Sequence, residues 1–376
     1  MNEHDKFCLI PEAGLNVTPN GVITPCCAIS DYKLGHITED SLSSVFFGEK
    51  YQQFRQAHRN NQLPAVCIEA CVNRNNSFVH RTGRNEVIQD AEIHHVKEPG
   101  KEKLIILDIG LGNICNLTCT FCDETWSSSW AKLKNKNSEI FSFDLDTTLD
   151  IAKNLNSMAH ISFKGGEPLN IPYLDKFLNE FYINNKDCTI SLVSNGTETN
   201  DRINDALFKF RVMLTISTEA TGSLYQYMRG GKYTWDDVLK NIKSFIARGC
   251  KHIEISSIVS LYNYTTWSND MLVIQTQLSE LGVKSNISAQ LCIHPNEESL
   301  FLLNQDQRRR LVNLIMEDVN RGLKIQGLEE MMASILTKRI VNTTRNKVIE
   351  KIQFNNSMRN MNLFDIVEDF TDHLDL

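Results

Sequence analysis

Apolar, β-prone runs alternate with stretches of helical periodicity through the middle of the chain. The apolar runs predict strands at residues 104–111, 160–163, 189–194, 212–217, 252–260 and 287–293. The periodic stretches predict helices at residues 146–158, 172–183, 200–209, 235–248 and 265–281. Asp146 and Thr234 suit the N-caps of two of these helices, and Pro172 suits a first turn. The alternation is typical of βαβ units, so it predicts a parallel sheet with right-handed crossovers.

Different signals flank this region. Pro19-Asn20-Gly21 lies between two short β-prone runs and predicts a hairpin, which would place Cys26 near Cys8. A helical pattern follows over residues 41–58, and the polar stretch 86–103 predicts a linker. Near the C-terminus, the pattern predicts a helix over residues 305–320 and then two or three short amphipathic helices.

Charge and hydropathy narrow the class of protein. The 376-residue chain has a formal net charge of −7 and no strongly basic stretch, so we expect no nucleic-acid partner. The N-terminus lacks the basic and apolar regions of a signal peptide. No apolar run approaches the ~20 residues of a membrane span. We therefore predict a cytoplasmic protein with no membrane partner.

Cysteine usage points to metal chemistry. The chain has 11 cysteines, which in a reducing compartment are better explained as metal ligands or buried thiols than as disulfides. Cys115, Cys119 and Cys122 form a CxxxCxxC loop directly after the first predicted strand. Thiolates are soft ligands, and such a loop can hold one face of an iron–sulfur cluster while leaving an iron open to a small molecule. A zinc loop or buried thiols are the alternatives.

A glycine-rich turn follows the second predicted strand. Its sequence is Lys164-Gly165-Gly166-Glu167-Pro168. Adjacent glycines let backbone carbonyls approach a ligand without interference from side chains. Because the carboxyl ends of parallel strands meet at one edge, we expect this turn and the cysteine loop on the same side of the sheet.

The loop and the turn together resemble the radical S-adenosylmethionine (radical SAM) superfamily. The resemblance implies an α/β fold, a partial (β/α)6 TIM-like barrel over residues 104–300. It implies a 4Fe–4S cluster on Cys115, Cys119 and Cys122, whose open iron binds S-adenosyl-L-methionine (SAM). Phe121 matches the aromatic position before the third cysteine.

Further positions match cofactor-contacting segments of that family. The residues expected to contact SAM are Gly165, Gly166, Glu167, Pro168, Ser194, Asn195, Ser217 and Arg229. The first four match the motif that holds the methionyl ammonium, and the next two match the ribose-contacting segment. Ser217 fits a ribose or carboxylate contact, whereas Glu219 departs from the aspartate usual near this point. Arg229 fits the SAM carboxylate or the substrate, with a surface arginine beside a glycine turn as the alternative.

The N-terminal cysteines resemble a second known module. The spacing of Cys8, Gly21, Cys26 and a final CxxxC pair is similar to the twitch domain, the one-cluster version of the SPASM domain. This resemblance covers residues 1–85 and implies an auxiliary 4Fe–4S cluster on Cys8, Cys26, Cys67 and Cys71, with Cys27 as a substitute ligand. A zinc ribbon on the same cysteines is the alternative. The N-terminal position departs from the usual order, in which this domain follows the barrel.

The implied chemistry is reductive cleavage of SAM to a 5′-deoxyadenosyl radical that abstracts hydrogen from a substrate. We expect a peptide or protein side chain as substrate and an external electron donor such as flavodoxin or ferredoxin. The alternatives are oxidation or epimerisation of a sugar or nucleotide derivative, and a non-catalytic iron–sulfur or zinc protein. Cys292 is a candidate hydrogen donor near the last strand. Residues 301–376 would form a helical extension over the barrel mouth or against the twitch domain.

Overall fold

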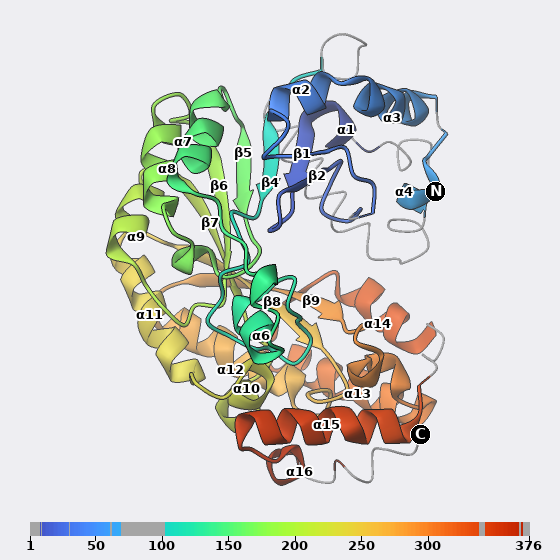
Figure 1. Cartoon of the computed structure of the whole chain (residues 1–376). Helices are drawn as coiled ribbons and strands as arrows, with labels where there is room; N and C mark the ends of the chain where they lie inside the picture. Colours follow the sequence, from blue (N-terminus) through green and yellow to red (C-terminus); the bar gives the residue numbers. More distant parts are fainter. Residues whose placement is uncertain are drawn as a thin grey trace. The chain divides into compact units, whose positions relative to one another are not determined.

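Parallel strands with intervening helices make up most of the chain in the computed structural model (Figure 1). The structure describes residues 8, 10–29, 31–60, 62–68, 102–337, 343–367 and 370. Cys71 and most of the predicted linker at 86–103 lie outside these residues. The chain divides into two compact units. The first comprises Met1–Asn116, Glu124–Val193 and Asn200–Met213, and the second comprises Leu117–Asp123, Ser194–Thr199 and Leu214–Leu376.

The sheet of the first unit joins the N-terminal hairpin to the parallel strands. Its strands, in order across the sheet, are β3 (Gly35–His36), β2 (Val22–Thr24), β1 (Gly14–Val17), β4 (Ile106–Ile109), β5 (His160–Phe163) and β6 (Thr189–Ser194). β1 and β2 pair antiparallel around a turn in which Gly21 has φ +87°, which confirms the predicted hairpin. β1 also pairs in parallel with β4, so the hairpin extends the sheet of the central region.

The described residues of the first unit also form helices. They are α1 (Ile10–Ala13), α2 (Leu42–Phe47), α3 (Glu49–Arg59), α4 (Ala65–Cys67), α6 (Ser128–Leu133), α7 (Leu145–Asn154), α8 (Leu174–Tyr182) and α9 (Asp201–Leu207), with 3-10 turns η3 (Asn137–Glu139) and η4 (Pro168–Asn170). α7 and α8 pack side by side (Figure 1). Phe177 of α8 meets Phe163 of β5 edge to face, with ring centroids 5.4 Å apart.

Two predicted helix starts in this unit are wrong. Asp144, and not Asp146, caps α7, because its carboxylate accepts a hydrogen bond from the Thr147 backbone at 2.7 Å. Pro172 lies before α8, which begins after Tyr173 in a left-handed backbone conformation with φ +67°. Hydrophobic periodicity locates a helix but does not fix its first turn, which is decided by a side-chain cap at α7 and by the left-handed backbone of Tyr173 at α8.

The second unit continues the same architecture. Its strands are β7 (Arg211–Ser217), which begins in the first unit, β8 (His252–Val259), β9 (Lys284–Leu291) and β10 (Ile325–Gln326), in that order. The neighbouring strands pair in parallel. Its helices are α10 (Gly222–Arg229), α11 (Trp235–Ala247), α12 (Trp267–Glu280), α13 (Gln305–Asn320), α14 (Leu328–Thr337), α15 (Arg345–Arg359) and α16 (Leu363–Ile366), with 3-10 turns η5 (Asn296–Glu298) and η6 (Leu300–Leu302).

The predicted α/β class is confirmed by these elements. Thr234 caps α11 in a reciprocal capping box with Asp237, as its position predicted. The last predicted strand, at 287–293, is β9 at Lys284–Leu291, and α10 and α6 were not predicted. Within the described residues, no helix is both long and apolar enough to cross a membrane.

Candidate functional site

The backbone that leads into the cysteine loop is fixed by Asn113, whose side chain is 2% exposed. Its Nδ2 donates to the carbonyls of Glu124 at 3.2 Å and Glu139 at 2.8 Å. Its Oδ1 accepts from the Phe141 backbone at 2.9 Å. One buried amide thus joins the start of the loop to two later segments of the first unit, so the loop starts from a rigid point.

Cys115 is held by the start of α6. Its N–H donates to Ser128 Oγ at 3.1 Å, and Ser129 Oγ donates to its carbonyl at 2.7 Å. Ser127 caps the helix by accepting from the Trp130 backbone. Sequence reasoning missed these serines, although three serines before a tryptophan are an N-cap signal. Their contacts orient the Cys115 backbone and leave its side chain half-buried.

The glycine turn packs directly against the residue before Cys115. Gly165 and Gly166 have φ of +81° and +58°, conformations that favour glycine. A Cβ at Gly166 would lie 2.5 Å from the Ile114 carbonyl oxygen. The Glu167 N–H donates to that oxygen at 2.7 Å. Backbone therefore meets backbone here, as a turn that cradles a ligand with its carbonyls requires.

The side chains that complete this turn are buried. Glu167 is 1% exposed, and its Oε1 accepts from the Leu169 backbone at 3.1 Å. Pro168 opens the 3-10 turn η4 and is also buried. A Cβ at Gly165 would lie 2.5 Å from Pro19 Cγ in the N-terminal hairpin, so the hairpin supports the turn.

In the second unit, Cys119 faces a buried ion pair. Arg229 Nη1 donates to Cys119 Sγ at 3.6 Å. The same guanidinium binds Glu219 through Nη2 and Oε1 at 2.7 Å and through Nε and Oε2 at 2.6 Å. Cys119, Glu219 and Arg229 are 8%, 1% and 5% exposed. Burial acts to lower the pKa of Arg229, but Glu219 outweighs it, so the net pKa is raised and Arg229 stays charged.

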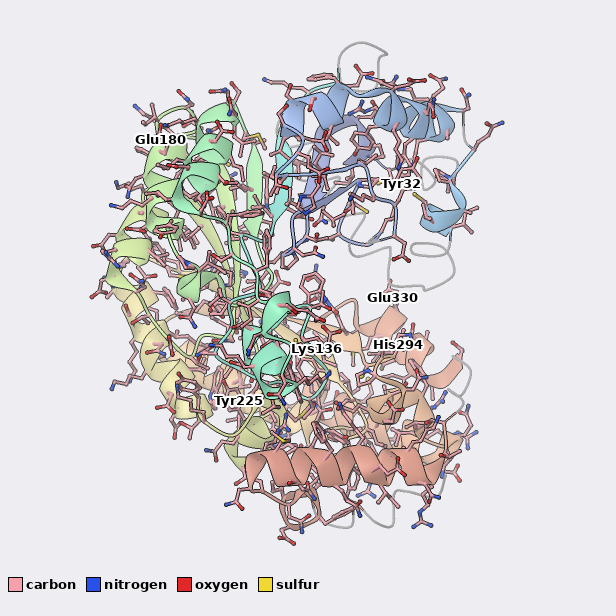
Figure 2. All side chains as sticks on the ribbon, in the orientation of Figure 1. Tyr32, Lys136, Glu180, Tyr225, His294 and Glu330 are labelled. Carbon is pink, nitrogen blue, oxygen red and sulfur yellow. The ribbon has the colours of Figure 1, made fainter. Side chains whose placement is uncertain are left out.

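An aromatic ring and a buried tyrosine lie near this ion pair. The guanidinium carbon of Arg229 lies 5.5 Å from the ring centroid of Phe121. Tyr225, on the same helix α10 and labelled in Figure 2, is fully buried. Its hydroxyl has no hydrogen-bond partner among the described residues. Arg229 thus stands against Cys119 and Glu219, and its predicted contact with SAM or substrate stays a prediction.

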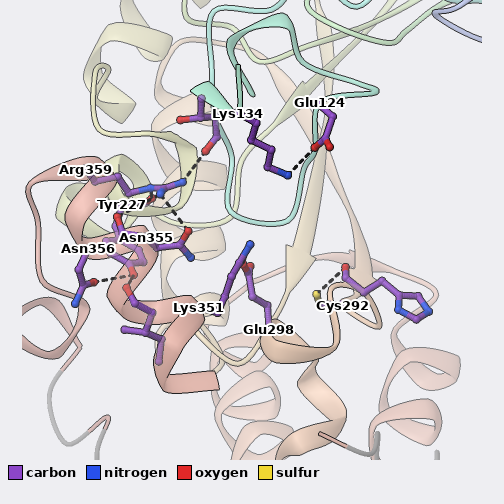
Figure 3. A network of polar contacts seen from close by, with 12 residues as sticks. Glu124, Lys134, Tyr227, Cys292, Glu298, Lys351, Asn355, Asn356 and Arg359 are labelled. Carbon is purple, nitrogen blue, oxygen red and sulfur yellow. Dashed lines mark hydrogen bonds and ion pairs between the residues drawn. The ribbon is translucent and has the colours of Figure 1, made fainter. Parts of the chain in front are cut away.

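Helix α15, near the C-terminus, reaches the cysteine loop (Figure 3). Arg359 Nη2 donates to the Thr118 carbonyl and its Nε to the Tyr227 carbonyl, each at 2.6 Å. The Thr120 N–H donates to the Met228 carbonyl at 2.9 Å. A Cβ at Gly230 would lie 2.6 Å from Thr118 Oγ1. The loop is therefore pressed between the end of α10 and the end of α15.

The other predicted SAM contacts shape turns of the second unit. Ser194 Oγ accepts from Gly196 N–H at 3.0 Å. Asn195 Oδ1 accepts from the Thr197 N–H at 2.9 Å and hydroxyl at 2.7 Å. Ser217, the last residue of β7, is half-buried. These hydrogen bonds shape the turn at residues 194–197, and the contacts of Ser194, Asn195 and Ser217 with SAM stay predictions.

Cys122 and Cys292 are also placed. The Cys122 N–H donates to the Cys119 carbonyl at 3.1 Å, which tightens the end of the loop. Cys292 is 4% exposed just after β9, and its Sγ donates to the His294 carbonyl at 3.4 Å (Figure 3). Burial raises the pKa of Cys292 well above its usual range, so it stays a thiol. A hydrogen donor must carry S–H, and the donor role itself stays a prediction.

The N-terminal cysteines that the structure describes lie in the first unit. Cys8 and Cys26 pack against one small core of Ile10, Ala13, Ile105 and Ile106, as the hairpin predicted. Cys67 ends α4, is buried, and has its Sγ 3.4 Å from His58 Nε2. Cys27 is exposed.

No three His, Cys, Asp or Glu side chains of the described chain gather in a group that could hold a metal ion. The structure carries no ligands, and Cys71 is not among the described residues. Which cysteines bind each cluster therefore stays a prediction from the motifs. Two observations support the predicted cluster on the loop Cys115–Cys122. They are the Gly165-Gly166 turn, which has no side chains, and the Arg229 cation beside Cys119.

Comparison with known families decides the class of protein. Residues 109–271 match the Radical SAM superfamily, and residues 8–72 match SPASM, an iron–sulfur cluster-binding domain. The chain therefore contains a radical SAM domain. Its SPASM-like domain precedes the radical SAM domain, as the N-terminal cysteines predicted. The cofactors of the two domains are a 4Fe–4S cluster, SAM and an auxiliary iron–sulfur cluster.

Individual relatives of this chain are distant in sequence. Radical SAM cyclopropyl synthase TigE of Paramaledivibacter caminithermalis is 22% identical over 270 residues, which are 66% of this chain and 55% of that protein. The chain spans about half the length of the curated relatives it matches.

Solved structures also match. Native anSMEcpe with bound AdoMet is 17% identical, with a TM-score of 0.44, over 64% of this chain and 68% of that chain. Streptococcus suis SuiB bound to S-adenosylmethionine is 16% identical, with a TM-score of 0.40, over 65% of this chain and 56% of that chain.

Proposed function

We propose that this protein cleaves SAM reductively and uses the resulting radical to abstract hydrogen from a peptide or protein side chain. The observation that carries the proposal is the environment of Cys119, a family ligand position that is buried against the Arg229 cation. Cys115, Cys119 and Cys122 would hold the cluster. When bound, the reduced cluster supplies the electron that splits SAM into methionine and a 5′-deoxyadenosyl radical.

Arg229 prepares Cys119 for ligation. A thiol must lose its proton to bind iron, and burial alone raises the pKa of Cys119. The nearby guanidinium opposes that effect, since its charge stabilises the thiolate. Glu219 holds the guanidinium at two points, so the cation cannot turn away from the sulfur.

The glycine turn prepares the SAM position. Gly165 and Gly166 present backbone without side chains, and Glu167 is locked by its own backbone bond to Ile114. Their carbonyls would accept from the methionyl ammonium, as the family resemblance implies. Ser194 and Asn195 would act near the ribose by fixing the turn in which they lie.

The choice of a peptide or protein substrate rests on the SPASM-type domain, because relatives with such domains most often modify peptides or proteins. In this proposal, flavodoxin or ferredoxin supplies electrons in the cytoplasm. The auxiliary cluster would accept the electron left on the product or return one to it.

The test is 5′-deoxyadenosine release by the anaerobically reconstituted, dithionite-reduced protein. We expect Cys115→Ala and Cys119→Ala to abolish release, because each removes a cluster ligand. Cys250→Ala is the matched control, since Cys250 is a buried thiol outside the loop and its loss should leave release unchanged. Release that persists in both loop variants contradicts the site assignment.

Substrate class is tested in the same assay with size-fractionated extract of the native host. Stimulation of release by the macromolecular fraction supports the peptide or protein substrate. Stimulation confined to the small-molecule fraction contradicts it and favours a sugar or nucleotide derivative. No release at all from a fully loaded cluster contradicts the enzymatic proposal.

A further inference from the structure

Helix α3 of the first unit buries polar side chains on one face. Tyr51, Phe54, Arg55 and His58 are its buried residues, and they follow helical spacing. A helix that only packs a core would place apolar residues at these positions. A buried arginine and a buried histidine cost free energy unless something satisfies them.

His58 faces a cysteine of the SPASM-like domain. It is 4% exposed, and its Nε2 lies 3.4 Å from Cys67 Sγ. Its Nδ1 is buried and has no hydrogen-bond partner in the described part of the chain. Packing against the Phe54 ring, with centroids 5.0 Å apart, fixes the imidazole plane. The contact to Cys67 is therefore the polar contact that the structure gives this ring, and Nε2–H can donate to a sulfur there.

Arg55 is a buried cation, and the two terminal nitrogens of its guanidinium group lack hydrogen-bond acceptors among the described residues. It is 0% exposed, and its guanidinium carbon lies 4.2 Å from the ring centroids of both Phe46 and Tyr51. Its Nε donates to the Pro11 carbonyl at 2.6 Å. Nη1 and Nη2 have no hydrogen-bond partner among the described residues. An unpartnered, buried guanidinium indicates an anion close by.

Neighbouring groups indicate where that anion belongs. Glu12 is already paired with Arg59, through Nε and Oε1 at 2.9 Å and Nη2 and Oε2 at 2.5 Å. Tyr51, on which Arg55 stacks, donates to the Gly14 carbonyl at 2.7 Å. Its hydroxyl also lies 3.4 Å from the carbonyl oxygen of Pro25, the residue before Cys26. Together with the contact between His58 and Cys67, this places the buried face of α3 beside cysteine-bearing segments of the chain.

We propose that His58 and Arg55 are positioning residues for the auxiliary cluster. His58 donates its Nε2–H to the Cys67 thiolate, and Arg55 supplies positive charge opposite the anionic cluster. The proposal rests on Cys8, Cys26 and Cys67 as ligands of that cluster. Reduction adds negative charge to the cluster, and both groups stabilise negative charge. Together they hold its midpoint potential above that of the same cluster without them.

The experiment uses the full chain with Cys115, Cys119 and Cys122 changed to alanine, so that only the auxiliary cluster is reconstituted. Iron content and the midpoint potential are measured by EPR-monitored titration with dithionite. We expect His58→Leu to keep its iron and to shift to a more negative potential. His58→Gln should restore part of the shift, because its amide N–H can reach the same sulfur. Arg55→Met should also shift the potential negatively, and Arg55→Lys should restore it.

His36→Leu is the matched control. His36 lies in the same unit and its ring contacts the Asn20 carbonyl and Thr38 Oγ1, so the potential should not move. An unchanged potential in His58→Leu at full iron content overturns the proposal. If His58→Leu and His58→Gln both lose iron while His58→Cys retains it, His58 is itself a cluster ligand. That outcome overturns the proposal that it is a positioning residue. Zinc in place of iron also overturns it. Because this background cannot cleave SAM, the result does not depend on the proposed reaction.

Discussion

Gly166 and Gly222 have nearly the same backbone conformation in very different surroundings. Their φ angles are +58° and +57°. A Cβ at Gly166 would meet the Ile114 oxygen at 2.5 Å, whereas a Cβ at Gly222 meets nothing within 4 Å. The strain of left-handed backbone is therefore equal at the two positions, and only the steric clash differs.

This pair isolates the contact between the glycine turn and the cysteine loop. Gly166→Ala should move Ile114 and Cys115, and we expect loss of cluster iron and at least a tenfold fall in 5′-deoxyadenosine release (about 1.4 kcal/mol). Gly222→Ala should cost only the backbone strain, on the order of 1 kcal/mol of stability, with normal iron content. Equal effects of the two substitutions on iron content contradict the assigned role.

Arg229 and Glu219 form the second residue-scale prediction. Arg229→Met leaves the Glu219 carboxylate buried without its partner, which should cost about 3–5 kcal/mol of unfolding free energy. The double variant Arg229→Met, Glu219→Leu should be less destabilised, because no unpaired charge remains. Urea unfolding of the cofactor-free chain measures both. A double variant no more stable than Arg229→Met refutes the buried-pair explanation.

Sequence reasoning found Arg229 but not its setting. The Arg-Gly pattern after the fourth strand singled out the residue, and Glu219 was noted only as a departure from the usual aspartate. The two side chains are ten positions apart on different elements, and no local pattern encodes their meeting at Cys119. His58 was missed for the same reason, since a lone histidine on a helix gives no signal until Cys67 is placed beside it.

At the scale of elements, α15 is the unexpected support of the cysteine loop. Its last residue, Arg359, donates to backbone carbonyls of Thr118 and Tyr227, and Tyr227 Oη donates to Asn356 Oδ1 at 2.9 Å (Figure 3). Lys351, about two turns before Arg359 on the same helix, lies 3.5 Å from the fully buried Glu298. The amphipathic pattern predicted helices after residue 320 but gave no partner for them.

The prediction at this scale concerns Arg359. Arg359→Met removes two charge-assisted hydrogen bonds to the loop and α10, and we expect a loss of about 2–4 kcal/mol in unfolding free energy, together with faster loss of cluster iron. The rate at which iron passes from the cluster to a chelator measures this loss. Arg345→Met, in the exposed first turn of the same helix, serves as control and should change neither. Normal iron retention in Arg359→Met would refute the supporting role.

Helix length decided which elements the sequence could predict. α13 at Gln305–Asn320 coincides with the predicted range of 305–320, because sixteen residues show several helical periods. α6 is six residues long and carries too few apolar positions to show a period, yet it fixes the Cys115 backbone. Short elements that position a site are therefore the ones that periodicity misses.

At the scale of the whole molecule, the two ligand sets occupy separate stretches of chain. Cys8, Cys26 and Cys67 lie near the N-terminus, whereas Cys115, Cys119 and Cys122 follow within one eight-residue loop. The triple variant Cys8→Ala, Cys26→Ala, Cys67→Ala should lose the auxiliary cluster alone. We expect iron to fall from about eight to about four per chain while uncoupled SAM cleavage continues.

The control for this prediction is Cys188→Ala, which removes a buried thiol of the first unit that lies outside both motifs. Its iron content should match that of the unchanged protein. Complete loss of iron in the triple variant would show that the two sites assemble together and would contradict independent loading. The rate of 5′-deoxyadenosine release distinguishes a lost SAM cluster from a lost auxiliary cluster.

The sequence by itself determined the class of this protein. Ligand spacing is a local property, so CxxxCxxC followed by Gly-Gly-Glu-Pro identified the radical SAM domain and the N-terminal cysteines identified the SPASM-like domain. Periodicity is also local, and it located most strands and long helices. Only the tertiary structure decided what stabilises the site. Arg229 on Cys119, Arg359 on Thr118 and His58 on Cys67 join residues far apart in the chain, and such contacts exist only once the chain has folded.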